Sequence, residues 1–142
     1  MIKRKNGQHN IQYFKKKVST AFINGALCNV DSNGFLIPAT NTSVNHVGVI
    51  LVTVAATDSD YASATFVPVD VCRTTDLFIA DVSAGTVAQT AVGAYYDLNA
   101  TGDKVDLSAT TTKQVYVQDI LDAQDQVVII VNSTAGADES GS

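Results

Sequence analysis

The sequence predicts an all-β protein, formed as a single small β-barrel or β-sandwich domain. Residues that favour helices are scarce: among 142 residues Glu occurs once and Met once. Short runs rich in β-branched residues recur between turn signals, as in proteins built from short strands. With 46% apolar residues, the chain is long enough to bury one core.

The first predicted hairpin joins residues 26–30 to residues 35–37. Asn33-Gly34 lies between the two runs, and this pair supplies the positive φ that tight hairpin turns require. Pro38 closes the second strand.

The next predicted pair consists of residues 47–54 and 66–71, separated by a polar link. Phe66, Val67, Val69 and Val71 alternate with Pro68 and Asp70, which predicts a strand with one apolar face. Because Pro68 has no N–H to donate, we expect this strand at a sheet edge or the proline at a bulge.

Five further short strands are predicted in the second half of the chain, while residues 87–93 predict a single helical turn or a loop. The strands cover residues 76–82, 95–98, 105–107, 115–121 and 126–131. Their short, even spacing favours a sandwich or a small barrel over βαβ units.

Charge divides the chain into three predicted parts: a basic N-terminal arm at 1–17, a β-domain at 18–131 and a polar, acidic tail at 132–142. The arm carries six positive charges and no acid, in a chain of net charge −5, so the remainder carries −11. An acidic body repels nucleic acid, whereas the arm alone could bind phosphate or an acidic protein surface. The alternative is that the arm is a disordered, solvated leader, as charged termini commonly are.

Candidate catalytic and metal sites are weak, so we expect a protein that is not an enzyme and has no cofactor. His9 and His46 are the only histidines, and neither has a partner at catalytic spacing. No phosphate-binding glycine motif occurs. Residues 97–103 space oxygen ligands like the start of an EF-hand loop, but Ser108 stands where the loop needs Glu, which favours a plain turn.

The two cysteines, Cys28 and Cys72, lie within or beside apolar runs, which predicts buried, reduced thiols. A bridge between them is possible but cannot be deduced from the sequence. No apolar run is long enough to cross a bilayer and no export signal is evident, so we expect neither membrane association nor Sec export.

Several segments in order resemble tailed-bacteriophage capsid decoration proteins over roughly residues 14–131. They read FINGALCNVDSNGFLIPAT, VGVILVTV, DYASATFVPVDV, DLFIADVSAGT and VGAYYDL. The resemblance implies a structural protein of the virion exterior, made in the host cytoplasm, that binds the assembled major capsid protein and cements its contacts. It also implies homo-oligomers, most often trimers, on the capsid lattice.

The expected capsid contact is the arm, which combines positive charge with apolar side chains that a solvated leader would not need. The candidate residues are Lys3, Arg4, Lys5, Ile11, Tyr13, Phe14, Lys15, Lys16 and Lys17. The alternative function is a head-fibre or adhesin module that binds a receptor or carbohydrate. Its expected markers are aromatic residues that stack on sugars, here Tyr61, Tyr95 and Tyr96.

Overall fold

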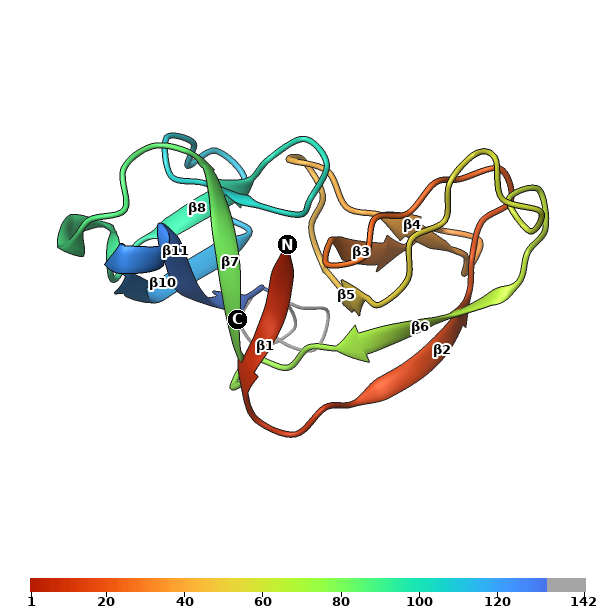
Figure 1. The fold of residues 1–142 in the computed structure, drawn as a ribbon, viewed down its shortest axis with the longest axis horizontal. Helices are drawn as coiled ribbons and strands as arrows, with labels where there is room; N and C mark the ends of the chain where they lie inside the picture. Colours follow the sequence, from red (N-terminus) through yellow and green to blue (C-terminus); the bar gives the residue numbers. More distant parts are fainter. Residues whose placement is uncertain (133–142) are drawn as a thin grey trace.

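The computed structural model describes residues 1–132, which form two β-sheets in two lobes that lie side by side (Figure 1). The only helical segments among these residues are two short 3₁₀ turns, η1 (Gln89–Ala91) and η2 (Asp122–Gln124). The prediction of an all-β protein is therefore confirmed. The part of the predicted acidic tail beyond residue 132 lies outside the described residues.

Sheet A is the six-stranded sheet. In spatial order its strands are β1 (Ile2–Asn6), β7 (Leu77–Ala84), β11 (Gln126–Val131), β10 (Val115–Leu121), β8 (Tyr95–Leu98) and β9 (Val105–Asp106). Neighbours in this order are antiparallel. The last strand, β9, also pairs in parallel with β7, the second strand in this order.

Sheet B is the five-stranded sheet of the other lobe. In spatial order its strands are β2 (Ile11–Lys15), β6 (Phe66–Val71), β5 (Gly48–Ile50), β3 (Leu27–Val30) and β4 (Leu36–Pro38). All four neighbouring pairs are antiparallel. The predicted hairpin forms as β3 and β4, and Gly34 in its turn has a φ of 86°.

Strand β6 is central, between β2 and β5, so the expectation that Pro68 marks an edge or a bulge is wrong. Its register to both neighbours is unbroken. The proline is tolerated because it lies opposite Leu51, just beyond the end of β5. Leu51 N–H still donates to Pro68 O at 3.1 Å, and only the return bond is missing. This missing bond also explains why β5 is shorter than the predicted strand at 47–54.

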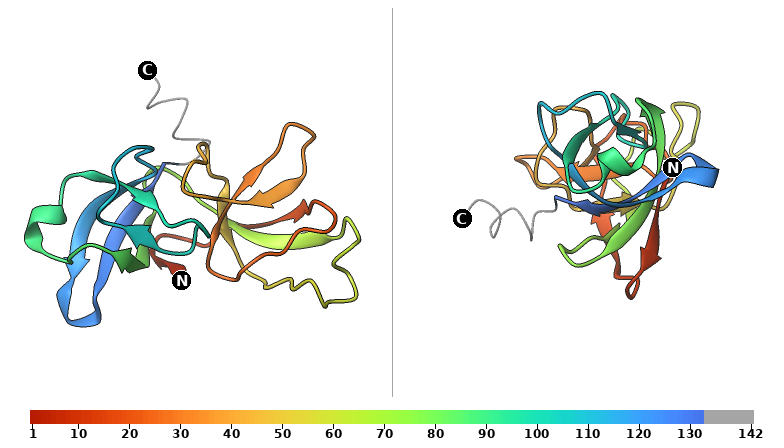
Figure 2. Two further views of the ribbon diagram at one scale, coloured as in Figure 1. Left: turned by 90° about the horizontal axis from the view of Figure 1, so that it is seen from above. Right: turned by 90° about the vertical axis from the view of Figure 1, so that its left-hand side faces the viewer.

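The first 17 residues do not form the expected arm, because they contribute one strand to each sheet. Strand β1 pairs with β7 in sheet A and β2 pairs with β6 in sheet B, so this segment passes from one lobe to the other (Figure 2). Charge alone suggested an arm, but alternate residues of β1 point inward, where Ile2 is 1% exposed. The partner strands lie more than 50 residues away in sequence, beyond the reach of a local pattern.

Each lobe has its own hydrophobic core, and the larger one crosses the boundary between the lobes. The smaller cluster lies within sheet B and centres on Phe22, Leu36 and Val69. The larger cluster fills sheet A and includes four residues from the other lobe: Leu27, Ala39, Val49 and Cys72. The lobes are therefore packed against each other rather than joined by a linker.

Both cysteines are buried near this boundary and form no disulfide, as predicted. Cys28 Sγ donates to Gly48 O at 3.3 Å and Cys72 Sγ donates to Val47 O at 3.4 Å. Burial, with a smaller contribution from the neighbouring Cys72, raises the pKa of the Cys28 thiol. A thiol held in its protonated form and away from solvent is a poor nucleophile, so Cys28 serves as a small apolar side chain.

Candidate functional site

The candidate site is an exposed face of the two-stranded ribbon that β2 and β6 form. Their register pairs Tyr13 with Pro68 and Lys15 with Phe66, and side chains of such directly opposed residues lie on the same side of a sheet. Ile11 belongs to the same side of β2. We call the set Ile11, Tyr13, Lys15, Phe66 and Pro68 the β2–β6 face.

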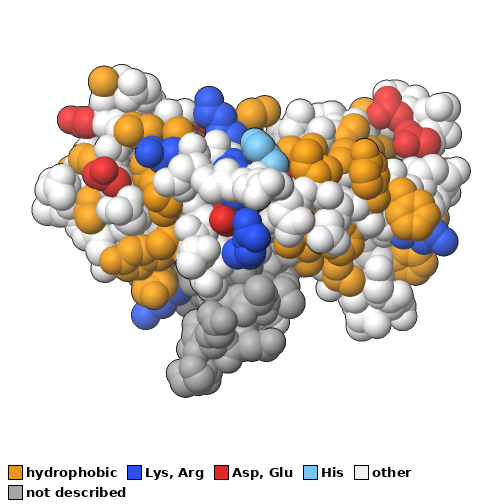
Figure 3. Space-filling model, turned by 90° about the horizontal axis from the view of Figure 1, so that it is seen from below, with side chains coloured by type: hydrophobic (Ala, Val, Ile, Leu, Met, Phe, Trp, Pro, Cys, Tyr) orange, Lys and Arg blue, Asp and Glu red, His pale blue; other side chains and the backbone are white. Residues whose placement is uncertain are grey.

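The apolar side chains of this face are unusually exposed for their size. Ile11 is 51% exposed, Tyr13 67% and Phe66 64%. Lys15 Nζ lies 5.8 Å from the centroid of the Phe66 ring, within the range of a cation–π contact. Figure 3 shows hydrophobic side chains gathered on this half of the molecule, with basic groups beside them. Large exposed apolar groups that cluster on one face commonly mark an interaction site.

The opposite side of the ribbon holds it rigid against the core of sheet B. Val67 and Val69 are buried there, and the half-buried Phe14 packs against the same cluster. Binding groups on a packed sheet are preorganised, so ordering them on contact with a partner costs little entropy.

Lys16 fixes the end of β2 from the inside. Its side chain is fully buried, and Nζ donates to three backbone carbonyls, those of Asp60 at 2.8 Å, Tyr61 at 3.1 Å and Ser63 at 2.5 Å. One ammonium therefore satisfies its three donors with one loop. Lys16 positions the loop beside the β2–β6 face but is itself inaccessible to a partner.

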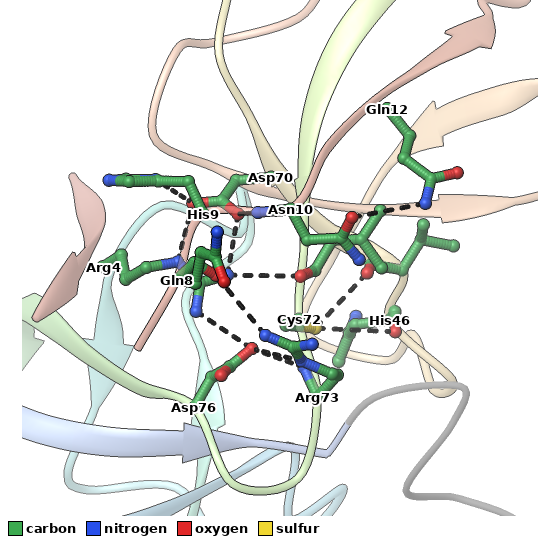
Figure 4. Close-up of polar contacts among 12 residues, drawn as sticks. Arg4, Gln8, His9, Asn10, Gln12, His46, Asp70, Cys72, Arg73 and Asp76 are labelled. Atoms are coloured by element: carbon green, nitrogen blue, oxygen red, sulfur yellow. Dashed lines mark hydrogen bonds and ion pairs between the residues drawn. The ribbon is translucent and has the colours of Figure 1, made fainter. Parts of the chain in front are cut away.

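The other end of the ribbon is anchored at the junction between the lobes (Figure 4). Arg4 makes a bidentate contact with Asp70, with Nε–Oδ2 at 3.0 Å and Nη2–Oδ1 at 2.7 Å. Its Nη1 lies 3.0 Å from Asp76 Oδ2 and forms a second ion pair. These three side chains are 1%, 3% and 4% exposed. The junction is therefore a buried charge cluster that links β1, β6 and the start of β7.

Two residues of the β1–β2 turn complete the bonding of Asp70. His9 Nδ1 lies 2.9 Å from Asp70 Oδ2, and Asn10 N–H donates to Oδ1 at 3.1 Å. Burial opposes ionisation of Asp70, but the hydrogen bonds from Arg4, Asn10 and His9 together outweigh it and hold its pKa below the usual range. The hydrogen bond to Asp70 is also the main reason why the pKa of Arg4 is raised. Asp70 is thus the group that ties the turn to the junction.

The nine predicted contact residues fall into three groups. Ile11, Tyr13, Lys15 and Lys17 are exposed in the sheet B lobe, and Lys3 and Lys5 are exposed on β1 in the other lobe. The side chains of Arg4 and Lys16 are instead buried and held by partners within the protein, and Phe14 packs against the core. These last three residues were predicted to contact a partner, but the position of their side chains indicates a structural role instead.

Sequence reasoning missed Phe66 as a surface residue. It was grouped with Val67 and Val69 on one apolar face, although strict alternation puts residues 66 and 67 on opposite sides. Counting alternate positions back from Val69 would have placed Phe66 and Pro68 together on the outer side.

The other sequence candidates are structural where the chain is described. Asn99 Oδ1 accepts from the N–H groups of Asp103 and Lys104, which makes residues 99–104 a hydrogen-bonded turn. Asp97 accepts three backbone N–H bonds, from Thr111, Thr112 and Lys113. Within residues 1–132 there is no group of three or more acidic, His or Cys side chains that could hold a metal ion.

The aromatic residues expected of a sugar-binding module separate in the structure. Tyr96 packs against the core of sheet A and Tyr61 against that of sheet B. Tyr95 is 49% exposed and forms an edge-to-face pair with Tyr116, with ring centroids 5.1 Å apart. This pair joins an exposed ring on β8 to a half-buried ring on β10.

No helix among residues 1–132 has the length and apolar character needed to span a membrane. The chain matches no protein-family model, and no curated protein is similar to it.

Proposed function

We propose that the protein is a structural virion protein that binds the outer surface of an assembled phage capsid and stabilises contacts between major capsid subunits. The observation that carries the proposal is the β2–β6 face, where exposed apolar groups and a cation stand on a rigid ribbon. The sequence resemblance to capsid decoration proteins supports a capsid as the partner. The proposed capsid contact is therefore the β2–β6 face, which includes Phe66, and not the whole N-terminal segment.

The chemistry of the face suits a protein surface. Tyr and Phe side chains provide most of the energy of many protein interfaces, and a neighbouring cation speeds encounter with an acidic partner. Many copies held by one shell gain from a high effective concentration, so each contact can be small. Because the protein would bind only the assembled shell, it would stabilise that state by mass action.

The test compares Phe66→Ser with Tyr95→Ser in co-sedimentation with shells of the major capsid protein from the encoding phage. Both residues are exposed, at 64% and 49%, and they lie in different lobes. We expect Phe66→Ser to weaken binding by about tenfold or more, as for a residue central to an interface, and Tyr95→Ser to bind normally. Shells saturated with wild-type protein should also melt at a higher temperature than bare shells. Equal binding by wild type and Phe66→Ser would refute the assignment of this face.

The second candidate function is a receptor- or carbohydrate-binding module, favoured by the Tyr95–Tyr116 pair. An exposed aromatic ring held by a second ring can stack on the apolar face of a sugar. Glycan binding that is lost in Tyr95→Ser but kept in Phe66→Ser would support this function over capsid binding.

A further inference from the structure

Besides its exposed face, sheet B has an open edge at β2. This strand stands at one end of the sheet, and β6 is its only ladder partner among the described residues. In Figure 1, β2 runs along the rim of its lobe. An exposed edge strand is a template on which another strand can pair.

The ladder defines which backbone groups point outward. Val71 N–H donates to Asn10 O and Lys16 N–H donates to Thr65 O, each at 2.9 Å, and the register between these two points is unbroken. In an antiparallel ladder, hydrogen-bonded and non-hydrogen-bonded pairs alternate. Even-numbered residues from 10 to 16 therefore bond to β6, whereas Ile11, Tyr13 and Lys15 direct their N–H and C=O groups away from it.

One of these outward groups is already engaged at the end of the strand. Lys16 forms a parallel bridge to Leu36, in which Lys17 N–H donates to Leu36 O at 3.0 Å. The geometry of such a bridge places Lys15 C=O on the Leu36 side as well. With respect to residues 1–132, the groups left open are thus the N–H and C=O of Ile11, the N–H and C=O of Tyr13, and the N–H of Lys15.

We propose that this edge pairs with the same edge of a second copy of the chain, antiparallel, about a two-fold axis at Tyr13. In this register the two copies of Tyr13 exchange both hydrogen bonds. Lys15 N–H of each copy donates to Ile11 C=O of the other. The pairing does not use Lys15 C=O, which is already engaged on the Leu36 side. The open donors of one copy therefore match the open acceptors of the other. Only Ile11 N–H, at the outer end, stays with water.

Side chains and charges fit this register. The two Tyr13 rings become direct neighbours across the new pair, an arrangement that stabilises sheets. Each Lys15 lies beside Ile11 of the other copy, and the two Lys15 residues are separated by about 14 Å along the strands, beyond the screening length at physiological salt. The result is one continuous sheet across both copies, in which two β2–β6 faces stand side by side.

A contact of one short strand is smaller than the interface of a stable dimer, so we expect weak association in solution. Fixed sites on a larger assembly would strengthen it through effective concentration. The two-fold pairing differs from the three-fold arrangement that the sequence resemblance implies. The number of copies in the oligomer therefore distinguishes the two arrangements.

Disulfide trapping tests the register directly, because both native cysteines are buried. At the two-fold axis, two Tyr13→Cys residues would have Cα atoms about 5.5 Å apart, which suits a disulfide. Two Ile11→Cys residues would be about 14 Å apart and could not join. Ile11 is the matched control because it lies on the same strand and is 51% exposed, against 67% for Tyr13.

Under mild oxidation we expect Tyr13→Cys to form a covalent dimer and Ile11→Cys to stay monomeric. An equal mixture of Ile11→Cys and Lys15→Cys should give the mixed dimer, because these positions oppose each other in the proposed pair. Equal cross-linking of the Tyr13 and Ile11 variants, or none of the Tyr13 variant, would overturn the proposal.

Sedimentation equilibrium gives an independent test without a new thiol. Tyr13→Pro removes an N–H that points away from β6, so it blocks the edge without removing a bond of the β2–β6 ladder. It deletes two of the four bonds between copies, and we expect self-association to weaken by about 30-fold. Phe66→Ser, which lies on the face and not on the edge, should self-associate like wild type.

A monomer at every concentration, a trimer, or a dimer that persists in folded Tyr13→Pro would contradict the proposal. If Tyr13→Pro fails to fold by circular dichroism, the cross-linking pattern decides. The outcome is separable from the proposed function, since shell binding is tested at Phe66 and self-pairing at Tyr13.

Discussion

The junction between the lobes and the interior of the sheet B lobe both bury ionisable side chains, but they compensate them differently. At the junction, Arg4 faces two carboxylates, Asp70 and Asp76. Inside the sheet B lobe, Lys16 donates to three neutral carbonyls and His46 Nδ1 lies 3.0 Å from the neutral Asn29 Oδ1. At the junction, a buried charge is compensated by opposite charges. In the sheet B lobe, the partners of the buried side chains are neutral dipoles.

The difference predicts how each region fails. Removing one member of a buried ion cluster leaves the opposite charge uncompensated, which costs several kcal/mol. Removing a cation that faces only carbonyls leaves neutral groups, which nearby water can partly satisfy. A buried neutral histidine fails only when the pH is lowered.

The largest effect is expected for Arg4→Met, which leaves Asp70 and Asp76 buried without their guanidinium. We expect the free energy of unfolding at pH 7 to fall by about 3–5 kcal/mol, measured by urea denaturation. Lys5→Met is the matched control because Lys5 is exposed on the same strand, and it should change stability by less than about 0.5 kcal/mol. If the two variants were equally stable, the junction would not depend on charge pairing.

His46 should produce a dependence of stability on pH. Burial lowers its pKa from 6.5 to about 4, so the unfolded chain takes up the proton first. Stability is then complete above about pH 6.5 and falls by about 3 kcal/mol as the pH is lowered to about 4. Urea unfolding at several pH values should show this slope in wild type and not in His46→Gln. The variant His9→Gln, which leaves His46 in place, should keep the slope.

Lys16→Met is expected to have the smallest effect of the three, a loss of about 1–3 kcal/mol in the free energy of unfolding at pH 7. Methionine fills a similar volume but leaves the carbonyls of Asp60, Tyr61 and Ser63 without the ammonium. Lys17→Met, at the exposed neighbouring position, should be close to wild type. A loss as large as that of Arg4→Met would show that neutral and charged partners are equivalent here.

The sequence predicted the strands whose evidence is local. Strands β6, β10 and β11 begin and end where the apolar alternation predicts, and the hairpin at Asn33-Gly34 forms as expected. The central pairing of β5 with β6 was also anticipated, although β5 is shorter than predicted. In these cases a strand and its turn signal are close together in the chain.

The N-terminal segment could not be predicted in the same way because its partners are distant. Nothing near Arg4 or Lys16 in sequence shows that Asp70 or the carbonyl of Ser63 will meet them, so both were expected to be exposed. Ile11 and Tyr13 were correctly expected to be accessible, although they belong to a sheet strand and not to a separate arm. The β2 residues of the candidate site could therefore be predicted from the sequence. Phe66 could not, because its exposure depends on which face of β6 is buried.

The pairing of β1 with β7 and of β2 with β6 also bears on the order of folding. Strands β1 and β2 can form no ladder until their partners, within residues 66–84, have been synthesised. Contacts between such distant segments require large loops to close, and proteins rich in them fold slowly. During synthesis, therefore, Ile11, Tyr13 and Phe14 should stay exposed in the nascent chain until β6 has been made, and general chaperones recognise such apolar stretches.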